Sequence, residues 1–346
     1  MKTIALIVLA LFITPGFAQS DSAQNAATDS EITPELDNAV NDGLAFLART
    51  QEDDGSWADG RFGKNVAITS LACIALMSDG NLPGRGPYGD AVDRGVEFIL
   101  ESSTDSGLIT SQSTNGPMYG HGFATLFLGE VYGMSVGGDN TARSQKLYDT
   151  LVKAIRLIEQ TQNEDGGWRY NPVPYDADVS VTICQIMALR SARNAGIEVA
   201  TETIDRAVEY VRQCQSTDGG FKYQIGSGSS AWPRTAAGVA SLFYAGIYDD
   251  DAIDKGLEYL ENNATPGRGA AVRSHYYYGH YYAVQCVYLA GGKHWETWWP
   301  AIREELLSSQ TNDGGWEDRS VGKTYGTAMA LIILQMPKRY MPIFQK

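Results

Sequence analysis

Acidic, imidazole and aromatic side chains gather at five places where a polar segment of the sequence gives way to an apolar one. Carboxyl and imidazole groups transfer protons in many active sites, and aromatic rings stabilise cations and pack against flat or apolar ligands. At one junction Asp178 directly precedes the apolar stretch 179–189, and Asp176 lies two residues earlier. The catalytic candidates are Asp178, Asp176, His121 and His280, and the ligand-binding candidates are His275, Tyr119, Tyr278, Tyr282, Trp232, Arg234, Tyr325 and Gln185.

Each candidate also has a structural interpretation. Aspartate at a helix start is a common N-cap worth about 1 kcal/mol, and an isolated histidine often only bridges helices. Asp178, Thr182 and Gln185 form one polar stripe on a helix, since residues three to four apart share a face. For the same reason His275, Tyr278 and Tyr282 share one face of their helix, so not every tyrosine of this cluster faces a common cavity.

Twelve predicted helical segments position these residues. Six are amphipathic, with apolar residues at i, i+3, i+4 and i+7 and charges elsewhere. They cover 36–50, 91–100, 147–160, 204–211, 253–260 and 301–307. Six nearly apolar segments alternate with them, over 66–77, 122–132, 179–189, 236–244, 281–289 and 326–335. The first kind predicts outer helices and the second inner helices of a double-layered ring, in which neighbouring hairpins bury each other's faces.

A seven-residue motif joins the two helices of each hairpin. Four copies share glutamine, two variable residues, aspartate, glycine, a small residue and an aromatic residue, at 51–57, 162–168, 215–221 and 310–316. Degenerate copies at 102–108 and 262–268 complete six units with a period of about 50 residues. Glycine supplies positive φ, aspartate bonds the turn backbone and the aromatic residue packs on an adjacent hairpin, so the motif is first of all structural.

The motif copies resemble the repeats of squalene and hopene cyclases and of protein prenyltransferase β subunits, over roughly residues 32–336. The resemblance implies an all-α fold, an (α/α)6 toroid of six helical hairpins. It also implies that the N-terminal ends of the inner helices converge on one mouth of a central cavity. Polar and aromatic residues open these helices, so three histidines, His121, His275 and His280, are expected around this mouth.

The same resemblance suggests chemistry for two sets of residues. The segment 176–180 resembles the cyclase acid motif, in which an aspartic acid protonates an alkene, and Asp178 matches the proton donor. Val179 replaces a carboxylate of that motif, and squalene-type cyclases have two toroidal domains where this chain has one. A prenyltransferase zinc site needs an Asp-x-Cys pair upstream of a histidine; His280 and Cys286 lack that pair, so we expect no metal and no cofactor.

The N-terminal residues and the composition limit location and partners. Residues 1–18 are typical of a secretory signal cleaved after Ala18, and 19–31 of a disordered leader, followed by a single toroid domain over 32–346 with six repeats. The apolar run is too short to span a membrane, so a periplasmic or extracellular location without a transmembrane anchor is predicted. The net charge of −14 disfavours nucleic acid. The cysteines Cys73, Cys184, Cys214 and Cys286 are expected to be buried free thiols.

Three functions remain open at this stage. The first is binding, with or without terpenoid cyclase-like transformation, of an isoprenoid or other apolar ligand, with Asp178 as acid and the histidines as polarising or relay groups. The second is a polysaccharide lyase or glycoside hydrolase acting on a sugar ligand through Asp176, Asp178 and Arg234. The third is a noncatalytic scaffold that binds a protein partner.

Overall fold

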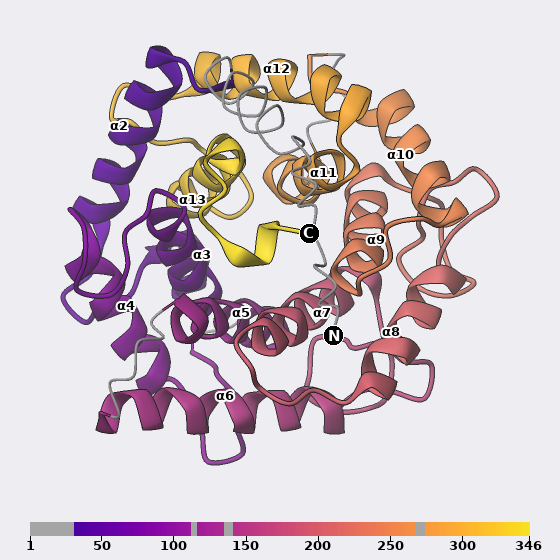
Figure 1. Ribbon diagram of the computed structural model, residues 1–346, viewed down its shortest axis with the longest axis horizontal. Helices are drawn as coiled ribbons and strands as arrows, with labels where there is room; N and C mark the ends of the chain where they lie inside the picture. Colours follow the sequence, from indigo (N-terminus) through magenta and orange to yellow (C-terminus); the bar gives the residue numbers. More distant parts are fainter. Residues whose placement is uncertain (1–30, 112–115, 135–140, 268–273) are drawn as a thin grey trace, which may run out of the picture.

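The computed structural model describes residues 31–111, 116–134, 141–267 and 274–346, within which the chain forms twelve α-helices. Figure 1 shows them in two layers around a common centre. The outer helices are α2 (Pro34–Thr50), α4 (Gly89–Glu101), α6 (Ala142–Gln160), α8 (Thr201–Gln213), α10 (Asp251–Ala264) and α12 (Gly292–Ser309). The inner helices are α3 (Val66–Met77), α5 (Met118–Met134), α7 (Val179–Asn194), α9 (Trp232–Tyr244), α11 (Tyr276–Ala290) and α13 (Lys323–Leu334). The predicted all-α toroid of six hairpins is confirmed. The proposed signal peptide and most of the leader lie outside the described residues.

The inner helices form a closed ring. Each packs against the next, from α3 through α5, α7, α9 and α11 to α13, and α13 returns to contact α3 and α2. Two glutamines bond across this seam between the sixth and first hairpins. Gln310 Nε2 donates to the Ala39 carbonyl at 2.8 Å, and Gln335 Nε2 donates to the Ala75 carbonyl at 2.9 Å. The seam is therefore hydrogen-bonded as well as packed.

Burial explains why one sequence pattern forms the inner layer and the other the outer layer. In α3 every residue except Ala67 is buried, because neighbouring inner helices cover its sides and outer helices cover its back. In α8 the buried residues recur every three to four positions, from Thr203 to Val211, and the other face carries charges. Each buried aliphatic side chain contributes about 1.5–3 kcal/mol to the stability of the fold.

The glutamine of each full motif copy joins two hairpins. Gln162 Nε2 donates to the Gly166 carbonyl of its own turn at 2.8 Å and to the Thr203 carbonyl of the next outer helix at 2.9 Å. Gly166 has a φ of +97°, and a Cβ there would lie 2.2 Å from the Arg206 carbonyl oxygen, so the turn requires glycine. The same paired bonds are made by Gln51, Gln215 and Gln310.

The motif aromatic residue fixes the outer helix against the inner one. Trp168 Nε1 donates to the Ile158 carbonyl at the end of α6 at 2.8 Å, and its backbone N–H donates to Thr182 Oγ1 in α7 at 3.1 Å. The equivalent contacts are made by Trp57 and Trp316. Phe221 keeps only the backbone bond, to Thr235 Oγ1 at 2.9 Å. The motif therefore has the structural role predicted for it.

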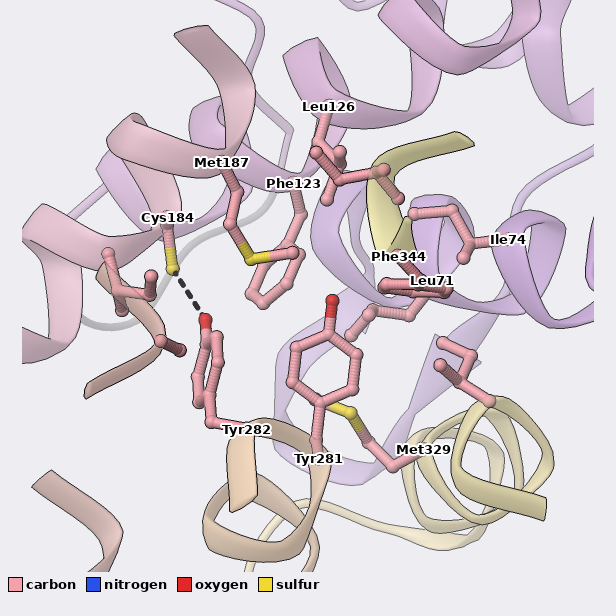
Figure 2. Close-up of a cluster of buried hydrophobic side chains, with 14 of the residues drawn as sticks. Leu71, Ile74, Phe123, Leu126, Cys184, Met187, Tyr281, Tyr282, Met329 and Phe344 are labelled. Carbon is pink, nitrogen blue, oxygen red and sulfur yellow. Dashed lines mark hydrogen bonds between the residues drawn. The ribbon is translucent and has the colours of Figure 1, made fainter. Parts of the chain in front are cut away.

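The C-terminal segment packs at the end of the ring where the inner helices finish. It contains two short 3-10 helices, η3 (Met336–Lys338) and η4 (Pro342–Phe344), and η4 contacts α7. The Ile343 N–H donates to Glu130 Oε2 at 3.0 Å, and burial raises the pKa of this carboxyl to about 7. Figure 2 shows Phe344 among inner-helix side chains that include Leu71 and Leu126. This segment therefore forms an apolar floor across the ring.

The first hairpin carries a small two-stranded sheet between its helices. Strands β1 (Ala58–Asp59) and β2 (Gly63–Lys64) pair antiparallel around the 3-10 helix η1 (Gly60–Phe62). The four cysteines are buried and free, as predicted. Among the described residues, no helix has the length and apolar character needed to cross a membrane.

Candidate functional site

A cavity of about 860 Å³ lies where the inner helices begin. Residues from the first two turns of all six inner helices line it, which confirms that these helix ends converge on one mouth. Six predicted ligand-binding residues are on its wall, namely Tyr119, Trp232, Arg234, His275, Tyr278 and Tyr325. Further along the helices the wall is apolar and includes Ile68, Leu71, Phe123 and Met329. The cavity is therefore polar and aromatic at its mouth and apolar towards its floor.

Asp178 is a fully buried carboxyl group whose side-chain partners belong to this wall. It is the N-cap of α7, and its Oδ1 accepts hydrogen bonds from the Val181 N–H at 2.9 Å and from the Ser180 hydroxyl at 2.6 Å. Its Oδ2 accepts a bond from the Tyr223 hydroxyl at 3.1 Å. Burial raises the pKa of Asp178 above its usual value, and these hydrogen bonds offset only part of that effect.

Hydroxyl groups connect Asp178 to the cavity. Ser180 and Tyr223, its two side-chain partners, both line the cavity. Tyr119, on the same wall, donates its hydroxyl to Ser180 Oγ at 2.8 Å, and the Tyr170 hydroxyl bonds to that of Tyr223. Two chains of hydroxyl groups thus lead from one buried carboxyl to the cavity surface.

Two turns hold this network in place. The Asp178 N–H donates to the Trp168 carbonyl at 3.0 Å, and the Val179 N–H donates to the Tyr223 carbonyl at 3.0 Å. The start of α7 is therefore held between the third and fourth motif turns. This pairing positions Tyr223 beside a carboxyl group 45 residues earlier in the chain.

Arg169, which also lines the cavity, adds a positive charge beside the network. Its guanidinium pairs with Asp176, and its Nε lies 3.7 Å from Asp178 Oδ2. It also lies over the rings of Tyr170 and Tyr223, at 5.1 and 5.7 Å from their centroids. Because an adjacent cation stabilises a carboxylate, Arg169 can accommodate the charge left on Asp178 after proton loss. Asp176, predicted as a catalytic residue, is thus an ion-pair partner at the rim.

Sequence reasoning did not identify Arg169, Tyr170 or Tyr223. The sequence does contain a pattern that could have identified the two tyrosines, because Tyr170 and Tyr223 both lie two residues after the aromatic residue of their motif copy. That offset places a tyrosine at the same point of two neighbouring turns. Since both turns contact the start of α7, the two tyrosine hydroxyl groups bond to each other, and that of Tyr223 also bonds to Asp178.

Two histidines are not at the mouth, which corrects the expectation that His121, His275 and His280 surround it. His121 is fully buried; its Nδ1 accepts from the Ile109 N–H at 3.1 Å, and its Nε2 faces the Ala154 carbonyl of α6. The ring of His280 packs against those of Trp232, Tyr276 and Trp298. Burial lowers the pKa of His121 to about 4 and that of His280 to about 3, so both are neutral bridging or packing groups.

Tyr282 and Gln185 also point away from the cavity surface. The Tyr282 hydroxyl lies 3.6 Å from Cys184 Sγ, as Figure 2 shows, and Gln185 Nε2 donates to the Met118 carbonyl at 2.9 Å. Gln185 therefore joins the adjacent helices α7 and α5, and Tyr282 reaches from α11 to α7, with α9 between them in the ring. The polar stripe expected along α7 is used for contacts with neighbouring backbone, and only its first member, Asp178, connects to the cavity.

A zinc site of the prenyltransferase kind does not fit these residues. His280 is enclosed by aromatic rings, and Cys286, six residues further along α11, donates its thiol to the Ala236 carbonyl at 3.3 Å. Residues six apart lie on different faces of a helix. No cluster of three or more metal-ligating side chains occurs among the residues that the structure describes.

The comparisons with known proteins agree with this fold. Residues 143–270 match the family model of the prenyltransferase alpha-alpha toroid domain. The type II terpene cyclase MstE from Scytonema is similar over 89% of this chain and 100% of its own, with 16% identity and a TM-score of 0.62. A form of MstE with an arginine replaced by alanine binds its substrate, geranylgeranyl dihydroxybenzoate. No curated protein sequence matches this chain.

A carbohydrate-active toroid is structurally similar as well. The α-1,6-mannanase GH76A of Salegentibacter, solved with α-1,6-mannotriose, covers 87% of this chain and 98% of its own at 7% identity, with a TM-score of 0.63. A protein from Actinoplanes matches 88% of this chain and 99% of its own at 18% identity, with a TM-score of 0.59. These likenesses establish the toroid fold, and together with the domain match they support the resemblance to the terpene cyclase and prenyltransferase repeats.

Proposed function

From this resemblance and the site, we propose that the cavity binds an isoprenoid or similarly apolar chain and that Asp178 is the acid for its terpenoid cyclase-like transformation. One observation carries the proposal. A buried carboxyl group whose environment favours its protonated form is hydrogen-bonded to hydroxyl groups on the wall of an apolar cavity. A general acid has to hold its proton until the substrate is in place, and burial shifts the pKa of Asp178 in the direction that this requires.

The cavity suits an apolar chain in size and in lining. Its volume of about 860 Å³ falls within the roughly 300–1,000 Å³ typical of small-molecule sites. Aliphatic and aromatic side chains of α3, α5 and α13 form its inner wall, with Leu71, Phe123 and Met329 above the floor. An isoprenoid chain would exchange water for these surfaces, so the hydrophobic effect favours its binding.

The chemistry assigned to Asp178 balances. Its proton adds to one carbon of an alkene, directly or through the Ser180 hydroxyl, and leaves a carbocation and a carboxylate. Arg169 and the Val181 N–H stabilise the carboxylate. Trp232, which lines the cavity, is available for cation–π stabilisation of the carbocation, which later returns a proton to the carboxylate.

The carbohydrate alternative receives less support from the geometry. Glycoside hydrolysis by paired carboxyl groups needs them on opposite sides of the scissile bond. Asp176 and Asp178 lie two residues apart and both contact the same guanidinium, that of Arg169. Among the described residues, none that lines the cavity carries a carboxyl group. Binding of a sugar, or of no small ligand as expected for a protein-binding scaffold, is therefore treated as an alternative outcome of the experiment below.

The first experiment asks whether the cavity takes an isoprenoid. Native mass spectrometry of the purified protein with geranylgeraniol should detect a one-to-one complex. Ala67→Trp, which places an indole on the cavity wall, should abolish it. Ala142→Trp, at an exposed position of the outer helix α6 away from the cavity, is the control with the same change in size. Binding of a mannan oligosaccharide in place of the isoprenoid, or of neither, would contradict the proposal.

The second experiment tests the acid. Asp178→Asn should fold and bind like the wild type and reduce formation of rearranged products from the bound isoprenoid by about 10²–10⁴-fold. Asp176→Asn is the matched control, because it removes a carboxyl from the same loop without touching the hydroxyl network, and it should keep most of the activity. Equal activity of the wild type and Asp178→Asn would remove Asp178 from the mechanism.

Export belongs to the same proposal. The composition of residues 1–18, which lie outside the described residues, supports a signal peptide cleaved after Ala18. N-terminal sequencing of the protein from the periplasm or medium of an exporting host should begin at Gln19. Retention of Met1 in a cytoplasmic product would contradict it.

A further inference from the structure

The charge on the cavity wall is opposite to that of the whole chain. The sequence has 41 acidic and 27 basic residues, yet the charged residues among the described cavity-lining ones are Arg169 and Arg234. The N-terminal ends of six inner helices also converge here, and each carries a partial positive charge. The potential at the mouth is therefore positive in an acidic protein.

Of these two charged residues, Arg234 has the fewer hydrogen-bond and ion-pair partners among the described residues. It lies in the first turn of α9, where a cation opposes the helix dipole. One of its terminal nitrogens donates to the Ser229 carbonyl at 2.8 Å, and its buried Nε has no hydrogen-bond partner. Within the described ranges it makes no ion pair. A local cost of this kind indicates a functional position.

Equivalent hairpins show how such a cation is normally neutralised. At the start of α13, Lys323 pairs with the motif aspartate Asp313 at 2.6 Å. In the first hairpin, Lys64 pairs with the motif aspartate Asp54 at 2.5 Å. In the fourth hairpin the motif aspartate instead accepts from the Ser230 hydroxyl at 2.8 Å and from a turn N–H, and Arg234 points to the cavity. In this hairpin the motif aspartate is thus bonded by uncharged donors, and Arg234 is not paired with it.

The two arginines differ in whether a nearby carboxylate neutralises their positive charge. Arg169 is held by Asp176 and approached by Asp178, while Arg234 makes no such contact with a described carboxylate. One uncompensated guanidinium matches one negative charge, and its planar fork binds a carboxylate through two parallel hydrogen bonds. Both guanidinium carbons lie within 6.0 Å of the centre of the Tyr223 ring, so a group bound by Arg234 would stand beside the Asp178 network.

We propose that Arg234 binds the carboxylate of an amphipathic ligand whose apolar chain fills the cavity. This inference rests on the proposed function, since it presupposes an apolar chain in the cavity, and it assigns that chain a singly charged head at the mouth. The head and the acid network are then neighbours, so the first double bonds beyond the head lie closest to the hydroxyl groups of Ser180 and Tyr223.

The test compares ligands that differ only in the head group. Isothermal titration at pH 8, where a carboxylic acid is ionised, measures binding of geranylgeranoic acid, geranylgeraniol and geranylgeranyl monophosphate. The wild type should bind the acid on the order of tenfold to a hundredfold more tightly than the alcohol. Arg234→Gln should remove that preference and leave the affinity for the alcohol unchanged. Arg156→Gln, on the exposed face of α6, should behave like the wild type.

A second variant separates charge from geometry. Arg234→Lys keeps the charge and loses the planar fork, so it should retain only part of the preference for the acid. The preference should also fall with added salt, because ions screen a group at the mouth. Circular dichroism confirms that each variant is folded before titration.

The outcomes distinguish this inference from the function on which it rests. Equal affinity of the wild type for acid and alcohol, or equal loss of both in Arg234→Gln, would overturn the role of Arg234 and leave the apolar cavity intact. Tighter binding of the monophosphate than of the acid would overturn the assignment of a carboxylate. Failure of the wild type to bind any of the three would overturn the proposed function itself.

Discussion

Asp59 and Asp178 are two buried carboxyl groups at the same end of the ring, and their surroundings differ. Asp59 lies at the seam, where its Oδ2 accepts the Tyr325 N–H in the first turn of α13 at 2.7 Å. Asp178 lies opposite the seam in the ring order, at the start of α7, with two side-chain hydroxyl groups as partners. Burial raises the pKa of both, that of Asp59 to about 6.

The comparison shows that a raised pKa does not by itself mark a catalytic acid. The partners of Asp59 are backbone N–H groups of another hairpin, so its carboxyl caps a helix and closes the ring. The partners of Asp178 are hydroxyl groups that line the cavity, and hydroxyl groups can exchange protons with a ligand. The type of partner therefore gives the first residue a structural role, and it is the basis on which we propose a chemical role for the second.

The largest expected effect on stability is that of Asp59→Ala. It leaves N–H groups at the start of α13 without an acceptor in a buried seam, which should lower the free energy of unfolding by about 2–3 kcal/mol. Asp178→Asn, which keeps an oxygen to cap α7, should lower it by less than about 1 kcal/mol. Urea denaturation at pH 5 measures both. A larger loss from Asp178→Asn would reverse the assignment of the two roles.

The next largest effect should be that of the titration of Asp59 on the pH dependence of the free energy of unfolding. Its pKa is about 6 in the folded protein against 3.8 for the free side chain, so the folded state binds more protons between these values. Stability is then gained at low pH and lost as the pH rises from about 4 to 6. This loss should be larger in the wild type than in Asp59→Asn by on the order of 3 kcal/mol, because other buried groups such as Glu130 titrate alike in both proteins. Denaturation midpoints at intervals across that range provide the measurement, and parallel curves for the two proteins would contradict it.

The helices could be predicted because their signals are local. Apolar periodicity distinguishes α8 from α7, and the spacing of the motif supplies the turns between them. The site was only partly predictable, because the position of a residue in a repeat fixes its height in the ring and not the direction of its side chain. Tyr119 and His121 are two residues apart on α5, which turns them to different faces, one to the cavity and one to α6.

The missing part of the site depends on contacts between hairpins. Tyr223 meets Asp178 only because the fourth motif turn packs on the start of α7, and Arg169 meets it from the third turn. Neither contact leaves a periodic pattern within one segment of sequence. His280 shows the reverse case, since a histidine next to a tyrosine cluster looked like a site residue and is instead enclosed by three aromatic rings.

The smallest expected effects are those of removing one cation at the seam and one on the cavity wall. The two substitutions should change the free energy of unfolding in opposite directions. Lys323→Gln breaks a partly exposed ion pair with Asp313 and should lower the free energy of unfolding by a few tenths of a kcal/mol. Arg234→Gln removes a cation from the positive end of α9 that has no carboxylate partner among the described residues, so it should raise that free energy by about 0.3–1 kcal/mol. Paired urea titrations at low salt resolve such differences. A residue that lowers the stability of the fold and is nevertheless present at a cavity mouth points to a ligand. If Arg234→Gln instead destabilises the protein, the arginine stabilises the fold, and its assignment to a bound carboxylate is weakened.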